Sequence, residues 1–180
     1  LMETLEAGGV EDDSYRIEAT FQGLEFHQPD FGFRIDGSVA FDAERTDSTA
    51  SLSLASDSLL RAGPENAFSW ENFTFDAERE IATGAYSMEF SGTAGIHLPG
   101  ILNGELILLT DQLFVGSAEL PPHQGVLRVQ GQDSAMTVSA GAGGLLSIVL
   151  VQGDGPELEI LSSWDALAEH LSELGLGAGI

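Results

Sequence analysis

Residues 14–26 of the chain, SYRIEATFQGLEF, decide the fold class. Apolar and polar side chains alternate from Tyr15 to Phe21, which is the pattern of a β-strand with one buried face. The apolar positions resume at Leu24, one residue after Gly23. Since glycine tolerates the backbone of a bulge, we expect a β-bulge at Gly23 and a continuing strand after it.

Similar stretches recur along the chain. Residues 31–41 (FGFRIDGSVAF) alternate with an interruption at Gly37, and residues 68–75 (FSWENFTF) alternate with a one-residue slip. Four short strands are expected in the segments VLRVQG, AMTVSAG, LLSIVLVQ and ELEILSS, separated by glycine-rich turns. Turn residues spaced about eight to twelve residues apart are typical of all-β proteins. The sequence therefore predicts an antiparallel meander of about ten strands, forming a strongly curved sheet or an incomplete barrel.

The pentapeptide FDAER occurs twice, at residues 41–45 and 75–79. Each copy follows an aromatic strand end and precedes a segment rich in serine or threonine. We interpret both copies as charged hairpin loops that join strands of the meander, with the aspartate starting the turn. The alternative is that they are two equivalent ligand-binding loops.

Two further segments differ from the alternating pattern. Residues 101–109 (ILNGELILL) are nearly continuously apolar, which favours a strand buried on both faces. Residues 163–174 have apolar side chains at helical spacing, with Ser162 or Ser163 as the cap. The resulting helix has one apolar face, so we expect it to pack on the sheet, with Trp164 buried.

Residues 1–13 carry five acids and no periodicity, and we expect them to form a loose acidic leader. Residues 14–176 are then a single β-rich domain, and residues 177–180 a tail. The chain has no apolar run of transmembrane length. Since its first residues lack the basic and apolar regions of a signal peptide, any signal or lipid-bearing cysteine is expected to lie outside these 180 residues.

The charge is strongly negative, with 29 acidic residues against six arginines and no lysine. Such a surface repels the phosphates of nucleic acids and of anionic membranes, so we expect neither as a partner. The excess of acids has two interpretations. It is a solubility surface of an exported or salt-adapted protein, or it serves a cation site or a basic partner.

Catalytic motifs are largely missing. There is no G-x-S-x-G elbow and no phosphate-binding loop, and the absence of cysteine excludes thiolate chemistry. The four histidines have no metal-binding spacing. Three of them, His27, His97 and His123, stand in expected turns near proline, and His170 belongs to the expected helix. We therefore assign no catalytic residue and expect no cofactor.

Carboxylates and aromatic side chains leave two other possibilities open. Carboxylate pairs are abundant and would suit a glycosidase if one pair were held in a cleft, but the sequence does not single out a pair. Four aromatic residues are candidates for stacking on sugars, although at strand spacing core packing is the commoner role: Phe31, Phe33, Trp70 and Phe114.

Residues 121–167 contain a Pro-Pro turn, a G-x-L-x-V-x-G hairpin, a Gly-Asp-Gly loop and a tryptophan. The residues that carry this pattern are Gly125, Leu127, Val129, Gly131, Gly153, Asp154, Gly155 and Trp164. The segment, about a quarter of the chain, resembles the C-terminal region of uncharacterised β-rich bacterial exported proteins, many of them predicted lipoproteins. The resemblance implies export to a Gram-negative envelope, in the periplasm, anchored at the outer membrane or secreted, and it implies no activity.

One departure from that pattern concerns calcium. The similar proteins begin this loop with an aspartate, whereas here Gly153-Asp154-Gly155 keeps one carboxylate, with Glu157 and Glu159 nearby. Calcium takes six to eight oxygen ligands. Asp154 and Glu157 are therefore weak metal candidates, and a plain hairpin is the alternative.

These observations favour a non-enzymatic binding module of the bacterial envelope or exterior. A curved sheet lined with Phe and Leu is suited to an apolar small molecule. The alternatives are a structural or adhesive module that uses its acidic surface, with or without calcium, and a carboxylate-dependent glycosidase.

Overall fold

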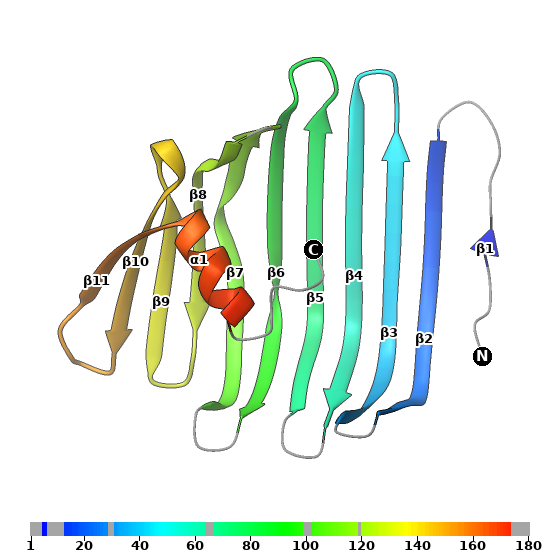
Figure 1. Cartoon of the computed structure of the whole chain (residues 1–180), viewed down its shortest axis with the longest axis horizontal. Helices are drawn as coiled ribbons and strands as arrows, with labels where there is room; N and C mark the ends of the chain where they lie inside the picture. Colours follow the sequence, from blue (N-terminus) through cyan, green and yellow to red (C-terminus); the bar gives the residue numbers. More distant parts are fainter. Residues whose placement is uncertain are drawn as a thin grey trace.

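The structure is a computed structural model that describes residues 5–6, 13–28, 31–63, 67–98, 102–118 and 120–173. It contains one antiparallel sheet and a short C-terminal helix (Figure 1). The strands are β1 (Leu5–Glu6), β2 (Asp13–Gln28), β3 (Phe31–Arg45), β4 (Thr49–Ala62), β5 (Ala67–Glu80), β6 (Ala85–Leu98), β7 (Leu102–Ser117), β8 (Leu120–Gln130), β9 (Ser134–Ala140), β10 (Leu145–Gln152) and β11 (Leu158–Ser163). A 3-10 turn, η1 (Ala142–Gly144), precedes β10, and the helix α1 spans Trp164–Glu173.

Each strand pairs with the next one in the chain, so the sheet is a meander from β1 to β11. Its two edges do not pair with each other within the described residues, and the sheet is not closed. This confirms the predicted fold class, with ten full strands and the two-residue β1. The first half is tall, since β2 has 16 residues and spans about 50 Å at the usual rise per residue. The second half is shorter, with seven residues in β9.

Irregular pairings cross the sheet in a line, and we call this line the crease. The register shifts between Phe21 and Leu24 in β2, opposite Gly37 of β3, and again where β3 meets β4. It shifts next to Asn72 of β5, which has a positive φ of 49°. Further shifts follow between β6, β7 and β8. Because a bulge bends its strand and increases the local twist, bulges in neighbouring strands bend the whole sheet.

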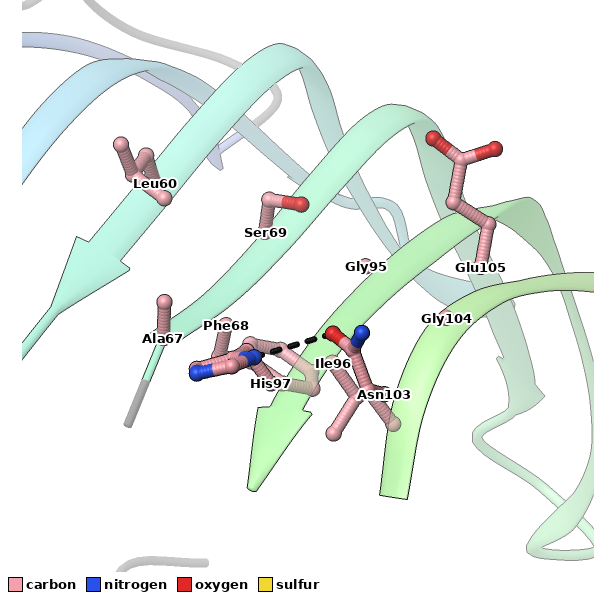
Figure 2. A pocket seen from close by; sticks show the side chains of 10 residues that line it. All are labelled: Leu60, Ala67, Phe68, Ser69, Gly95, Ile96, His97, Asn103, Gly104 and Glu105. Atoms are coloured by element: carbon pink, nitrogen blue, oxygen red, sulfur yellow. Dashed lines mark hydrogen bonds between the residues drawn. The ribbon is translucent and has the colours of Figure 1, made fainter. Parts of the chain in front are cut away.

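The bend gives the sheet an inner and an outer side. Figure 2 shows strands β4–β7 arching, with Ser69 and Glu105 projecting from the outer side of the arch. Ser69 pairs with Gly95, and Gly95 pairs with Glu105, so these residues share one face of the sheet. The neighbouring pair Phe68 and Ile96 belongs to the opposite, concave face, because successive side chains of a strand alternate between faces.

The core lies in the second half of the sheet, beneath α1. Phe114 of β7 and Leu146 of β10 are the largest fully buried side chains, at 2% and 1% exposure. The ring of Phe114 packs edge-on against that of Trp164, with ring centres 6.0 Å apart. The indole Nε1 of Trp164 donates to the carbonyl oxygen of Pro122 at 3.0 Å. Trp164 is half-buried rather than buried, and it attaches the first turn of α1 to β7 and β8.

The start of α1 follows the predicted capping with one adjustment. Ser163 is the cap, since its Oγ accepts from the backbone N–H of Ala166 at 3.2 Å. Asp165 is one position too early for a capping box, but its charge still stands in the first turn, where the helix dipole favours an anion. The expected last residue of the helix, 174, lies outside the described residues.

Several sequence expectations need correction. Both FDAER copies are strand segments and not hairpin loops, because β3 and β5 continue through Arg45 and Glu80. The apolar run in β7 is not buried on both faces, since Ile107 is 54% and Leu109 46% exposed. Part of the loose leader, Leu5–Glu6, pairs with β2.

The expected turns around histidine and proline also differ. His97 lies near the end of β6 and His123 in β8, and His27 is in β2. Pro121 and Pro122 belong to β8. They precede Gly125, where the pairing of β8 with β9 begins, so their missing N–H groups interrupt no hydrogen bond between these two strands. The predicted bulge at Gly23, the slip in β5 and the four C-terminal strands are confirmed.

Candidate functional site: the concave apolar face

The concave side of the sheet is apolar across the strands, and we call it the apolar face. One rung of paired residues crosses five strands as Ile17, Phe41, Leu54, Phe75 and Phe90. The next rung runs Tyr15, Ala43, Leu52, Ala77, Met88 and Phe114. Beyond the crease another rung runs Gly92, Leu108, Val129, Met136, Leu150 and Leu158. The register thus aligns the apolar residues of neighbouring strands, and together they form a continuous apolar surface.

Aromatic side chains concentrate on the tall half of this face. On β5, Trp70 packs against Phe68 at 4.8 Å and Phe73 at 4.6 Å between ring centres. The bulge at Asn72 makes the second contact possible, since it brings two positions three residues apart to the same side. Phe90 stacks on Phe114 at 6.0 Å, which links these strands to the core beneath α1.

Burial on the apolar face is incomplete. In the central strands Phe41, Leu54 and Phe75 are half-buried, and towards the edge Ile17 is 40% and Tyr15 58% exposed. The side chains shield one another because the sheet curves around them. Within the described residues, α1 lies over the β7–β8 end and no further layer covers β2–β6 (Figure 1). As far as residues 13–28, 31–63, 67–98, 102–118 and 120–173 are concerned, the tall half of the sheet is therefore a single layer with an open apolar side.

The outer face carries ion pairs, together with exposed apolar side chains on β7 such as Ile107 and Leu109. Arg34 binds Asp36, which also accepts the backbone N–H of Gly23 at 2.6 Å and so fixes the bulge of β2. The hydrogen bond from Arg34 is the main cause that lowers the pKa of Asp36, and the Gly23 bond adds to it. Arg16 binds Glu18 at 2.6 Å and Arg128 binds Asp111 at 2.5 Å, so charges on this face are paired in solvent.

A shallow hollow of about 270 Å³ opens over the ends of β4–β7 (Figure 2). It forms over Gly95, which has no side chain, and Ser69 and Glu105 flank it. At its rim, His97 Nδ1 and Asn103 Oδ1 are hydrogen-bonded at 2.9 Å. Glu105 is the single carboxylate among the lining residues, so the hollow lacks the acid pair that glycoside hydrolysis needs.

The residues singled out in the sequence do not assemble into one site. Asp154 and Glu157 are exposed in the connection between β10 and β11. In the described part of the chain, no group of three or more His, Asp or Glu side chains is placed to hold a metal ion. His123 is exposed on β8, and the side chains of His27, His170, Phe31 and Phe33 lie outside the described residues. Phe114 is a core residue, and Trp70 belongs to the apolar face.

The FDAER repeat contributes to the apolar face in a way that the sequence does not reveal. Its two copies occupy the same rungs, because residues 41–45 and 75–79 both pair with residues 50–54 of β4. In each copy Phe, Ala and Arg belong to the concave side, and Asp and Glu to the outer side. An in-register repeat at a fixed spacing is the sequence feature that points to this arrangement.

No family model, curated protein or solved structure matches the chain. The resemblance of residues 121–167 to exported β-rich proteins stays a prediction. None of the described helices is long and apolar enough to cross a membrane.

Proposed function

We propose that this protein is a non-enzymatic binding module that holds an apolar ligand against the concave side of its sheet. The observation that carries the proposal is the set of apolar rungs, above all Ile17–Phe41–Leu54–Phe75–Phe90, which crosses five strands with no second layer over it in the described residues. Folded monomers rarely expose contiguous apolar patches of more than a few hundred Å², and larger patches mark binding surfaces.

The energetics favour a covering ligand. Removal of apolar surface from water stabilises by roughly 25 cal/mol per Å². Phe41, Leu54 and Phe75 are partly shielded by their neighbours, and each retains surface that an acyl chain or a similar molecule would cover. The curvature set by the crease suits an elongated ligand, which would contact several rungs at once.

Binding fits the distribution of polar groups better than catalysis does. On the strands, acids such as Asp36, Asp42 and Glu78 share the convex face, where they are in solvent and not in a cleft with the apolar side chains. The proposal includes a location in the bacterial envelope or outside the cell. The acidic surface and the absence of cysteine are compatible with it, and the resemblance of residues 121–167 suggests it.

The test is titration with a neutral apolar dye, N-phenyl-1-naphthylamine, whose fluorescence rises in apolar surroundings. We expect saturable binding, weakened at least tenfold by Leu54→Asn on the concave side. Ser53→Asn is the matched control, since Ser53 is the neighbouring residue and faces the other side. Circular dichroism and the melting temperature establish that both variants are folded.

Two outcomes contradict the proposal. In the first, the delipidated protein sediments as a monomer and does not bind the dye. The other is equal weakening by Leu54→Asn and Ser53→Asn. If the protein instead sediments as a dimer that takes up dye only after dissociation, a second copy covers the apolar face, and the adhesive alternative replaces the carrier.

A further inference from the structure

The arginines are divided between the two faces. Arg61 shares a concave rung with Ile35 and Phe68 on the far side of the crease, and it has an interaction partner. Arg16, Arg34 and Arg128 lie on the outer face, and each is hydrogen-bonded to a carboxylate. Arg45 and Arg79, the last residues of the two FDAER copies, belong to the apolar face by alternation from Phe41 and Phe75. These two arginines therefore stand at the border of the part of the apolar face that lies between the hairpin turns and the crease.

Register brings Arg45 and Arg79 to one rung. Both pair with Ala50 of β4, one from each side. Arg79 also pairs with Tyr86 of β6, and Arg45 also pairs with Asp13 of β2, whose side chain lies outside the described residues. Two strand spacings separate their backbones, about 10 Å. Both lie at the end of the sheet where the β3–β4 and β5–β6 hairpins turn (Figure 1). In the structure a guanidinium nitrogen of Arg79 lies 3.7 Å from the position of a Cβ on Gly84, in the β5–β6 turn. A group shared with Arg45 above Ala50 therefore requires another rotamer of the long Arg79 side chain.

The charges of these two side chains are available. Both are exposed, and among the described residues neither has an acidic group at ion-pair distance. In a chain of net charge −23, an anion is repelled from most of the surface, so two adjacent guanidinium groups single out one place where it is attracted. Guanidinium groups bind carboxylate and phosphate through paired hydrogen bonds.

The apolar face begins immediately beside this pair. The next rung contains Ala43, Leu52, Ala77 and Met88, and the rung beyond it contains Phe41, Leu54 and Phe75. An anion held at Arg45 and Arg79 with an attached acyl chain would direct that chain along β4 towards the crease. On that next rung Leu52 lies between the small residues Ala43 and Ala77, so the chain would lie on Leu52 and then on Leu54.

We infer that the ligand is an anionic lipid, with its carboxylate or phosphate headgroup bound by Arg45 and Arg79 and its acyl chain on the apolar face. This inference rests on the proposed function and adds the charge and the orientation of the ligand. It assigns the repeat a role, since two copies in register are what place two arginines on one rung.

The experiment compares sodium oleate with methyl oleate, which has the same chain and no charge, as competitors of N-phenyl-1-naphthylamine. The test variant is Arg45→Gln/Arg79→Gln. The control is Arg16→Gln/Arg128→Gln, which removes the same two charges from the outer face. We expect the test variant to lose at least tenfold in oleate affinity and to keep its methyl oleate affinity, while the control binds both competitors as the wild type does.

Each remaining outcome has a distinct meaning. Equal affinity of the test variant and the wild type for oleate overturns the headgroup assignment and leaves the proposed function intact. Equal loss in both double variants also overturns it, because net charge then explains the effect. If neither competitor displaces the dye from the wild type, the apolar face does not bind acyl chains, and the proposed function fails together with the inference. Competition by acetate or phosphate as strong as by oleate shows a simple anion site without a lipid.

Discussion

Phe41 of β3 and Phe75 of β5 lie on either side of Leu54 of β4, in one rung of the apolar face. They are the first residues of the two FDAER copies, so the repeat is a repeat in space as well as in sequence. Its hydrophobic members build the concave surface, and its acids face the solvent on the other side.

The first prediction separates the two faces of the repeat. Phe75→Ser removes a half-buried aromatic ring from the apolar face and should lower the free energy of unfolding by about 1–2 kcal/mol. Asp76→Ser, one residue further on the exposed outer side, should change it by less than about 0.5 kcal/mol. Urea denaturation measures both. A larger loss for Asp76→Ser than for Phe75→Ser would show that the faces are assigned the wrong way round.

The second prediction concerns the attachment of α1. Trp164→Ala removes both the contact with Phe114 and the hydrogen bond to Pro122, and should cost about 3 kcal/mol of stability. Trp164→Phe keeps a ring against Phe114 and loses the hydrogen bond, so we expect about 1 kcal/mol. Chemical denaturation checks the order of the two variants. Equal stabilities of all three proteins would mean that α1 is not attached to the sheet.

The third prediction tests the close packing between β7 and β8. A Cβ on Gly125 would lie 2.5 Å from the ring of Phe114, and the φ of Gly125 is 143°. Gly125→Ala should therefore destabilise by about 2 kcal/mol or more, and Phe114→Leu in the same chain should recover part of the loss. Gly104→Ala is the control, since Gly104 also has a positive φ, of 159°, but nothing lies within 4 Å of the corresponding Cβ, so the difference between the two variants measures the steric contact. A neutral Gly125→Ala would contradict this packing in the melting curves.

The fourth prediction concerns pH. Arg34 and the Gly23 N–H favour the charged form of Asp36, so its pKa is lower in the folded protein than in the unfolded chain. The unfolded state then binds the proton more readily, and stability falls as the pH falls through the folded pKa of Asp36. Above the unfolded pKa the contribution is fully present.

Carboxyl NMR shifts followed from pH 6 to pH 2 measure the titration of Asp36. Asp36→Asn should reduce the loss of stability on acidification, and Asp76→Asn, at an exposed position on the same face, is the matched control. A midpoint for Asp36 at or above that of a model aspartate would refute the role of Arg34.

The strands could be predicted from the sequence because a half-buried strand has alternating apolar and polar residues within its own segment. Alternation around Tyr15 and Phe21 predicts β2, and glycine at position 23 predicts its bulge. The sequence prediction is wrong for the FDAER segments, because Asp and Glu are depleted in strands and therefore favour a loop. Here those acids project from an outer face that is wholly in solvent, where charge costs little. Likewise, Ile107 and Leu109 are apolar residues on the solvated side, which periodicity alone does not distinguish from a doubly buried strand.

The candidate site was not predictable in the same way, because it depends on register. That Arg45 and Arg79 share a rung follows from the lengths of two hairpins and from the pairing of both strands with β4. A slip of one residue in either hairpin would send one arginine to the outer face. The sequence contains the repeat, but not the alignment that makes it a pair.

The most direct test of the central claim locates the ligand. Stearate with a nitroxide on its acyl chain broadens the NMR signals of nearby methyl groups. We predict broadening of Leu52 and Leu54 on the concave side, and unchanged signals from Ile107 and Leu109, which are exposed on the outer side. Broadening of Ile107 and Leu109 with Leu52 and Leu54 unaffected, or no selective broadening at all, would contradict it.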